Sequence, residues 1–589
     1  MQRGVNLSEN VIYSINGPVI TVKDTKSFAM LEMVYVGNKE LLGEVISIKS
    51  SFTTIQVYES TTGLKPGEPV FPTGTPISVT LGPGILSNIF DGIERPLKQI
   101  AEKSGAFISA GSHVEPLDIT KKWDVKLKVK VGDVLSPGQI YGVLPETVLI
   151  EHRMMVPPDK RGTVVEVMED GEYTINDCVV KFEDSEGKVQ ELTLVQKWPI
   201  KIDRPIKKRL PISIPLITGQ RIIDTIFPIA KGGTAAIPGG FGTGKTMTQH
   251  QLAKWCDADI IVYVGCGERG NEMTQVLEEF SELVDPKSGR PLMERTVLIA
   301  NTSNMPVAAR EASIYTGITL AEYYRDMGYH VALMADSTSR WAEALREISG
   351  RLEEMPAEEG FPAYLPSRIS QFYERAGYVQ NLNFTEGSVS IIGAVSPQGA
   401  DFSEPVTQNT KRFVRCFWAL DKQLAYVRHY AAINWTESYS EYIGDLSKWY
   451  NKNISPRFLL NRQEITVLLA EENKLMEIVK LIGSDVLPDD QKLVIEISKV
   501  IRVGFLQQNA FHKDDTYVPL AKQMKMMDVI LYLNKKGKEY LKTGKSLNMF
   551  IDTGIFEKVT KMKYDVSNEK YEQLDDYFNL IDQAISKVH

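Results

Sequence analysis

A chain of 589 residues is too long for one hydrophobic core, and at about 150 residues per domain it predicts about three to five domains. Apolar residues make up 43% and charged residues 24%, which is globular composition and excludes a disordered or collagen-like chain. The net charge of −8 argues against a general nucleic-acid binder, which would carry a basic domain. Four cysteines without a CxxC pair suggest neither a disulfide framework nor a zinc site, so we expect a reducing compartment.

The chain carries no recognisable targeting or membrane-spanning segment. Residues 1–6 do not lead into the apolar stretch of a secretion signal, and no segment approaches about 18 uninterrupted apolar residues. We therefore expect a cytoplasmic, multidomain protein.

Residues 1–70 are predicted to form an N-terminal β-barrel. Short segments rich in β-branched residues are separated by close turn signals such as Gly17-Pro18 and Pro66-Gly67, a pattern typical of a small closed barrel. The predicted strands are residues 11–15, 19–22, 43–48 and 54–58. Residues 71–115 are rich in glycine and proline and are predicted to be a connector with one short helix.

Strand signals return in residues 116–195, which we interpret as a second small β module. Its predicted strands are residues 126–131, 162–167 and 178–182.

Residues 196–440 alternate between strand and helix patterns, which predicts a parallel α/β sheet. Residues 260–264, 296–300 and 331–335 are compact apolar runs that fit strands buried on both faces. After residue 440 the periodicity is helical, which predicts an all-α domain over 441–589 with helix breaks at Gly483, Pro488 and Gly504.

A phosphate-binding loop is the strongest chemical signal in the chain. The motif G-x-x-x-x-G-K-[ST] follows a predicted strand at 234–237 and precedes a predicted helix at 246–254. Its glycines allow backbone N–H groups to face phosphates, the lysine reaches the β- and γ-phosphates, and the threonine hydroxyl binds Mg²⁺. The motif consists of Gly239, Gly240, Phe241, Gly242, Thr243, Gly244, Lys245 and Thr246.

Two carboxylates end strands of the same predicted sheet. Asp336 follows an apolar run, where a Walker-B aspartate would hold Mg²⁺, and Glu268 ends the strand that begins at Ile260. Ligands in open α/β sheets lie beyond the carboxyl ends of the strands, so we expect Lys245, Glu268 and Asp336 to converge. Glu268 could polarise an attacking water and Arg269 could hold the γ-phosphate, although by spacing alone Glu268 fits a helix N-terminal acid equally well.

Segments along nearly the whole chain resemble the catalytic A subunit of rotary vacuolar and archaeal-type (V/A-type) ATPases. They are LGPG (81–84), FDGIERPL (90–97), LITGQR (216–221), FPIAKGG (227–233), the phosphate loop, VGCGERGNEM (264–273), NTSNMP (301–306), MADSTSRW (334–341) and EPVTQ (404–408).

The resemblance implies a multidomain α+β fold: an N-terminal β-barrel, an inserted non-homologous β region (116–195), a RecA-like P-loop α/β domain (196–440) and a C-terminal helical domain (441–589). It implies Mg²⁺-dependent ATP hydrolysis or synthesis, coupled to H⁺ or Na⁺ transport by a separate membrane sector. Lys245, Glu268 as the water-activating carboxylate, and Arg269 would be catalytic, and Thr246 and Asp336 would bind the metal.

The partners implied by the resemblance are B-type non-catalytic subunits in an A3B3 hexamer, which would supply an arginine finger in trans, together with central-shaft and peripheral-stalk subunits. No nucleic acid is expected. The chain would be cytoplasmic and peripheral to a membrane through the assembled complex.

The resemblance also assigns Tyr430 and Phe511 to the adenine site, although read alone both are ordinary core aromatics. The chain departs from the family where Gly240 and Ala431 replace common prolines and Pro366 replaces a common glycine. These departures bear on the fine geometry of the site and leave the required residues of the motif intact.

Two other classes remain open. A polymer-moving RecA-like ATPase, either Rho-like or of the flagellar/type III export kind, shares the core chemistry, but the acidic balance disfavours RNA and an export ATPase should lack the β insertion. A non-catalytic nucleotide-binding subunit is disfavoured because Lys245 and Glu268 are both present. The choice of coupled ion lies in other subunits, and the sequence does not give the physiological direction, because synthesis and hydrolysis use the same site.

Overall fold

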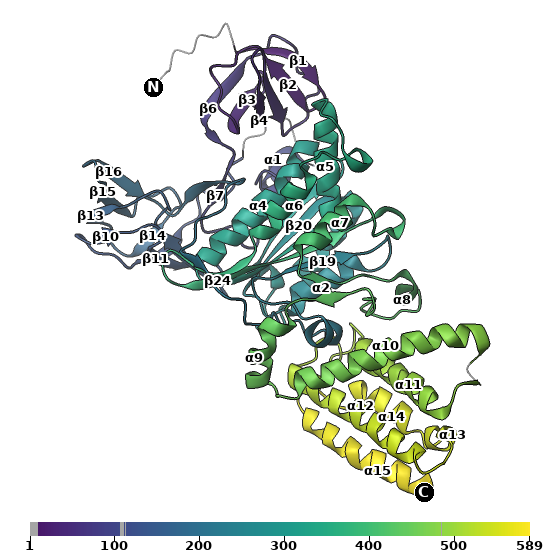
Figure 1. Cartoon of the computed structure of the whole chain (residues 1–589). Helices are drawn as coiled ribbons and strands as arrows, with labels where there is room; N and C mark the ends of the chain where they lie inside the picture. Colours follow the sequence, from purple (N-terminus) through teal and green to yellow (C-terminus); the bar gives the residue numbers. More distant parts are fainter. Residues whose placement is uncertain (1–9, 106–110, 112–113, 484–485, 589) are drawn as a thin grey trace. The chain divides into compact units, whose positions relative to one another are not determined.

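The computed structural model of the chain describes residues 10–105, 111, 114–483 and 486–588 (Figure 1). The first nine residues of the predicted barrel domain, including the N-terminus considered for a targeting signal, lie outside this described part. The chain divides into two compact units. Unit 1 consists of Met1–Pro211, Ala258–Pro397 and Phe402–Phe413, and unit 2 consists of Ile212–Asp257, Gln398–Asp401 and Val414–His589.

Unit 1 begins with the predicted β-barrel, which has six strands, β3 and β6 being additional to the four that were predicted. The strand order is β1-β2-β5-β4-β3-β6, and a bridge between Val11 and Pro69 brings the first strand against the last. Alternate residues of β3 are buried, and the interior is filled by aliphatic side chains such as Val34, Val45 and Ile55. The strands are β1 (Ile12–Asn16), β2 (Val19–Val22), β3 (Glu32–Val36), β4 (Leu41–Ile48), β5 (Thr53–Val57) and β6 (Val70–Pro76).

The connector contains the single short helix that was expected, α1 (Leu97–Ser104), within its described residues. Two strands flank the turn-rich part, β7 (Ser78–Leu81) and β8 (Ile89–Phe90). β7 pairs with β17 (Gln196–Pro199), which follows the second β module and brings the chain back beside its own connector.

The second β module is confirmed as two four-stranded sheets, ordered β10-β13-β15-β16 and β12-β11-β9-β14. The prediction of a strand at 126–131 was wrong, because β9 spans Trp123–Leu127 and the chain then turns, with Lys130 donating its backbone N–H to Asp133 at 2.8 Å. The other strands are β10 (Val134–Leu135), β11 (Ile140–Pro145), β12 (Glu151–Met155), β13 (Gly162–Val167), β14 (Gly171–Tyr173), β15 (Val180–Glu183) and β16 (Val189–Leu192).

The rest of unit 1 is the predicted parallel α/β sheet. Its order is β24-β22-β20-β21-β8, and these neighbours are all parallel. The parallel strands are buried on both faces, as their apolar runs indicated. They are β20 (Ile260–Glu268), β21 (Thr296–Thr302), β22 (His330–Asp336) and β24 (Glu386–Val395), with β23 (Gly377–Gln380) and β18 (Lys208–Arg209) antiparallel at one side.

Helices connect these strands. The central one is α4 (Val307–Asp326), which is buried along nearly its whole length. The others are α3 (Gly270–Glu282), α5 (Thr338–Arg351), α6 (Leu365–Glu374) and α7 (Pro405–Phe413), with short 3₁₀ turns at Leu292–Arg295 and Glu358–Gly360.

Unit 2 combines a small strand group with a helical bundle. β19 (Thr234–Pro238) pairs in parallel with β25 (Cys416–Phe417), which pairs with β26 (Tyr439–Ser440). The helices are α2 (Lys245–Trp255), α8 (Lys422–Tyr426), α9 (Ile443–Asn453), α10 (Phe458–Ile482), α11 (Asp489–Lys499), α12 (Leu520–Leu541), α13 (Leu547–Ile551), α14 (Ile555–Asp565) and α15 (Asp576–Val588). Shorter helical turns are the π-helices Ile222–Ile226 and Val500–Leu506 and the 3₁₀ turns Gln398–Ala400 and Tyr571–Asp575.

Two of the three predicted helix breaks are confirmed. Gly483 ends α10 with a positive φ of 86°, and Pro488 precedes α11. The break at Gly504 was wrong, because a π-helix (Val500–Leu506) continues through it. The glycine serves packing instead, since a Cβ there would lie 3.0 Å from the backbone of Thr560 in α14. Among the described residues, no helix has both the length and the apolar content needed to cross a membrane.

Candidate functional site

The phosphate loop lies in unit 2 between β19 and α2. Gly242 and Gly244 have φ values of 77° and 89°, in the left-handed region that glycine adopts without steric cost. The hydroxyl of Thr243 donates to the carbonyl oxygen of Gly240 at 2.8 Å, which closes the loop on itself. The predicted strand–loop–helix context is therefore present.

Lys245 is the first residue of α2 and folds back over the loop. Its ammonium group donates to the carbonyl oxygens of Gly239 at 2.7 Å and Gly240 at 2.9 Å. Thr246 follows it in the first helical turn, where backbone N–H groups and the helix dipole favour an anion. The positive charge, the hydroxyl and the helix terminus are thus held at one place.

Gly240 lies close to a neighbouring turn, a contact that was not visible in the sequence. A Cβ added there would lie 3.2 Å from the Cβ of Ala400, in the Gln398–Ala400 turn that packs against the loop. A larger residue at this position would require Ala400 to shift by a few tenths of an ångström.

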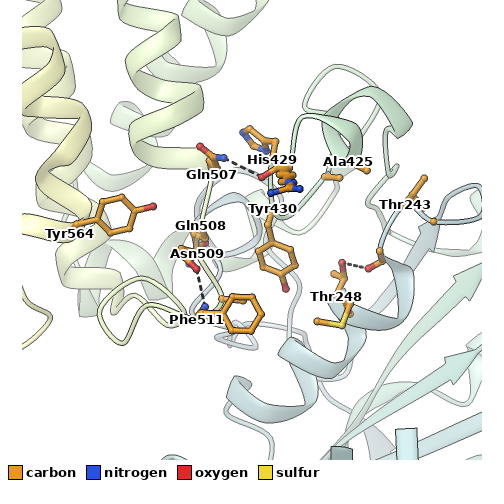
Figure 2. Close-up of a pocket in the computed structure, with 16 residues that line it drawn as sticks. Thr243, Thr248, Ala425, His429, Tyr430, Gln507, Gln508, Asn509, Phe511 and Tyr564 are labelled. Atoms are coloured by element: carbon orange, nitrogen blue, oxygen red, sulfur yellow. Dashed lines mark hydrogen bonds between the residues drawn. The ribbon is translucent and has the colours of Figure 1, made fainter. Parts of the chain in front are cut away.

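Tyr430 and Phe511 line the same cavity as the phosphate loop. The cavity has a volume of about 600 Å³, and both its lining and α2 belong to unit 2. Figure 2 shows both rings projecting into this space, which also receives Thr248 from α2. The Phe511 side chain is 95% exposed, an unusual position for a large apolar ring, and the Tyr430 hydroxyl has no hydrogen-bond partner among the described residues. The arrangement offers aromatic surface beside a phosphate loop.

The remaining lining residues carried no sequence motif, and they come from helices as well as loops. Met247 comes from α2, Ala425 from α8 and Tyr564 from α14, and most of the others lie beside the two aromatic residues in the chain. They include Ala425, Arg428, His429, Gln507, Gln508 and Asn509.

The two acidic residues lie on neighbouring parallel strands of unit 1. Gly265 of β20 is in register with Asp336 of β22, and Glu268 ends β20 three residues later. Asp336 is 3% exposed and accepts a hydrogen bond of 3.2 Å from the hydroxyl of Tyr263. Burial, the charge of Asp336 and the neighbouring Glu272 raise the pKa of Glu268 to about 8. This end of the sheet therefore carries closely spaced carboxylates.

The arginines near Glu268 differ in their placement. Arg269 is exposed immediately before α3, and Arg340 and Arg310 lie against the backbone beside Glu268. A Cβ on Gly267 would lie 2.8 Å from the Arg340 Cβ and 3.0 Å from the Arg310 Cδ. We did not predict Arg340 or Arg310, although Arg340 stands four residues after Asp336 in a segment that carried the resemblance.

The residues nominated for Mg²⁺ are chemically suited to it. Thr246 offers a hydroxyl and Asp336 a buried carboxylate, both of them hard oxygen donors of the kind that Mg²⁺ prefers. Burial is the largest cause of the raised pKa of Glu268, and the charge of Asp336 and the neighbouring Glu272 raise it further, so a cation would relieve charge repulsion at this end of the sheet. Because Thr246 and Asp336 belong to different units, the expected convergence of Lys245, Glu268 and Asp336 stays a prediction.

A buried strand, a glycine loop with left-handed turns, and a lysine and threonine that open a helix define a P-loop nucleotide-binding protein. Its parts match the ATP synthase alpha/beta family: the beta-barrel domain over residues 12–74, the barrel-sandwich domain over 114–201 and the nucleotide-binding domain over 219–440. Residues 447–551 match the C-terminal domain of V and A type ATP synthase.

Relatives that match nearly the whole chain narrow the class. The chain is 59% identical to the V-type ATP synthase alpha chain of Halothermothrix orenii, over 98% of each chain. It is 54% identical to the A subunit of the A-type ATP synthase of Methanopyrus kandleri, over 99% of each. The chain belongs to the family of V-type and A-type ATP synthase alpha (A) chains.

A solved structure shares the fold at low sequence identity. The assembled ATPase EscN of the enteropathogenic E. coli type III secretion system superposes with a TM-score of 0.64 and 21% identity, covering 89% of this chain and 100% of that one. This similarity concerns the fold alone.

Proposed function

We propose that this chain is the catalytic subunit of a rotary V/A-type ATPase, which hydrolyses or synthesises ATP in step with H⁺ or Na⁺ transport through a separate membrane sector. The observation that carries the proposal is the cavity in unit 2 that joins the phosphate loop to Tyr430 and Phe511. An adenine ring and a triphosphate require these two surfaces next to each other.

In the binding step, adenine would occupy the cavity between Tyr430 and Phe511. An exposed phenylalanine supplies a stacking surface, and ring contacts of this kind typically contribute about 0.5–1.5 kcal/mol beyond area burial. The phosphates would lie on residues 239–246, where Lys245 would exchange its two carbonyl acceptors for phosphate oxygens.

In the chemical step, Glu268 would orient and polarise the attacking water, and Arg269 would hold the γ-phosphate. Thr246 and Asp336 would hold Mg²⁺, which supplies charge neutralisation on the phosphates when bound. Phosphoryl transfer of this kind depends on positioning and electrostatics, so the proposed residues would act by placing the attacking water and by stabilising charge on the γ-phosphate. Burial lowers the pKa of Arg340, but Glu343 and Glu268 raise it overall. Arg340 would balance the negative charge of Glu268.

The proposed division of the chain is a barrel (1–70), a connector (71–115), the inserted β region (116–195), a nucleotide-binding domain (196–440) and a helical domain (441–589). Three such chains would alternate with three B-type subunits, each of which would supply an arginine finger in trans. Central-shaft and peripheral-stalk subunits would complete the complex and hold it, on the cytoplasmic side, to a membrane.

The alternative of an export ATPase shares the fold, as the EscN similarity indicates. The inserted module of two four-stranded sheets and the 59% identical relative favour the V/A-type assignment. A purely structural subunit is disfavoured because Lys245 and Glu268 are both retained.

The test is ATP hydrolysis by the purified full-length chain, alone and mixed with a B-type subunit. We expect little turnover alone and clear Mg²⁺-dependent turnover in the mixture, because the arginine finger comes from the partner. Equal turnover with and without the partner would contradict the shared site.

A further inference from the structure

Gln508 lies at the base of the cavity in unit 2 and is only 3% exposed. No sequence motif accounts for a buried amide at this position, since its neighbours Gln507 and Asn509 are polar and more exposed. The polar atoms of the Gln508 side chain all have backbone partners.

The side-chain amide joins three separate segments of the chain. Its oxygen accepts the backbone N–H of Arg221 at 2.5 Å. Its nitrogen donates to the carbonyl oxygens of Gly219 at 3.1 Å and Asp515 at 2.8 Å. One acceptor and two donors are the groups that these three backbone atoms require, and only an amide of this length supplies both kinds.

The backbone of the same residue reaches the first aromatic wall. The N–H of Gln508 donates to the carbonyl oxygen of Tyr430 at 2.7 Å. Tyr430 is therefore tied to a residue that is itself fixed on three other sides.

The second aromatic wall begins at the next residue. Asn509 donates its backbone N–H to the carboxylate of Asp515 at 2.7 Å and accepts the N–H of Phe511 at 3.0 Å on its side chain. Because Gln508 and Asn509 both bond to Asp515, the segment that carries Phe511 starts from a fixed point. Gln508 is thus connected by hydrogen bonds to both segments that carry the rings.

We propose that Gln508 is a positioning residue for the nucleotide base, which holds Tyr430 and the Phe511 segment at the separation that admits one aromatic ring system. The proposal rests on the assignment of this cavity to adenine. Gln508 acts through Tyr430 and Asn509, so its loss should weaken recognition of the base and leave the phosphates unaffected.

The experiment compares Mg-ATP with Mg-tripolyphosphate, which has the phosphates without the base. Both are titrated calorimetrically into the full-length wild-type chain and into Gln508→Met and Gln508→Glu. Met has a similar length but cannot make these hydrogen bonds. Glu keeps the oxygen that accepts from Arg221, but its second carboxylate oxygen would face the carbonyl oxygens of Gly219 and Asp515. We expect ATP affinity to fall about tenfold in both variants while tripolyphosphate affinity stays within about twofold.

Gln523→Met is the matched control. Gln523 is fully buried in the same unit and also makes three side-chain hydrogen bonds, with Thr225, Asp224 and Val518, but it does not line the cavity. A general loss of stability should appear in Gln508→Met and in Gln523→Met alike. A changed ratio of ATP affinity to tripolyphosphate affinity should appear only in the Gln508 variants. In the complex with a B-type subunit, Gln508→Met should raise the KM for ATP and leave kcat within about twofold.

Equal losses for both ligands, or no loss for either, in the Gln508 variants would overturn the positioning role. The variant Tyr430→Ala shows whether such a result instead means that the cavity does not bind adenine. If Tyr430→Ala also binds ATP as the wild type does, the adenine assignment falls and the Gln508 proposal falls with it.

Discussion

Arg221 and Asp515 form an ion pair of 2.6 Å in which both side chains are completely buried. Arg221 also donates to the carbonyl oxygen of Gln507 at 2.8 Å, so the pair holds the segment that forms one wall of the cavity. The guanidinium and the carboxylate thereby link the turn after Gly219 to the chain that runs past Phe511.

Arg221→Met should destabilise unit 2 strongly, because it leaves the Asp515 carboxylate buried without its partner. Removing one member of a buried pair typically costs about 3–5 kcal/mol. Arg457→Met is the control, since Arg457 is 65% exposed in its pair with Asp528 and such pairs contribute about 0–1 kcal/mol. The measurement is urea unfolding of the full chain, and equal losses in the two variants would contradict the prediction.

Lys245→Ala should weaken ATP binding and turnover together, because the ammonium group contacts phosphates in both the ground state and the transition state. We expect at least about a tenfold loss of affinity from one charge-assisted contact. Lys254→Ala removes a lysine from the last turn of the same helix and should bind ATP normally. Unchanged affinity in Lys245→Ala would remove the phosphate assignment.

His429 should make the stability of unit 2 depend on mildly acidic pH. Its ring contacts the carbonyl oxygens of Arg502 at 3.1 Å and Ala431 at 3.4 Å, and burial, together with the charge of Lys563, lowers its pKa. A histidine with a lowered folded-state pKa contributes stability that is complete above the unfolded value of about 6.5 and is lost as the pH falls through the folded value.

The measurement is the free energy of unfolding of the wild type and of His429→Gln between about pH 7.5 and 5. The wild type should lose more stability than the variant as the pH falls below about 6.5. Parallel curves over this range would contradict the assignment.

Deleting residues 116–195 should leave nucleotide binding in unit 2 intact and harm assembly. The module is not an independent appendage, because His152 contacts the hydroxyl of Tyr323 at 2.9 Å and Glu146 accepts from Tyr324 at 2.9 Å, both tyrosines belonging to α4. The deletion therefore uncovers buried tyrosines in unit 1. Calorimetry with ATP tests whether the shortened chain still binds nucleotide, and the size of the complex formed with a B-type subunit tests assembly. A complete ring formed by the shortened chain would contradict the predicted assembly defect.

The phosphate loop was predictable because its requirements are local. Gly242 and Gly244 must adopt left-handed backbone, and Lys245 must open a helix, so the sequence pattern itself encodes the geometry. The strands that end at Glu268 and Asp336 were predictable for a similar reason, since strands buried on both faces are continuous apolar runs.

The frame of the cavity was not predictable, because it is made of long-range contacts. Arg221 and Asp515 are separated by 294 positions, and each alone is an ordinary charged residue in a sequence. Gly504 was wrongly predicted to break a helix, because its packing against Thr560 of α14 is a long-range contact that the local sequence pattern does not show. Tyr430 and Phe511 were nominated through family resemblance, and the pattern around them gave no independent reason.

Glu268 has the central role in the proposed mechanism, and ATP hydrolysis and ATP binding in the complex with a B-type subunit test it directly. Glu268→Gln should bind ATP as the wild type does and lose at least about a hundredfold in turnover, the usual contribution of a positioned general base. Glu272→Gln is the control, because it changes the neighbouring carboxyl group and should retain turnover within about tenfold. Near-normal hydrolysis by Glu268→Gln would contradict the proposed mechanism.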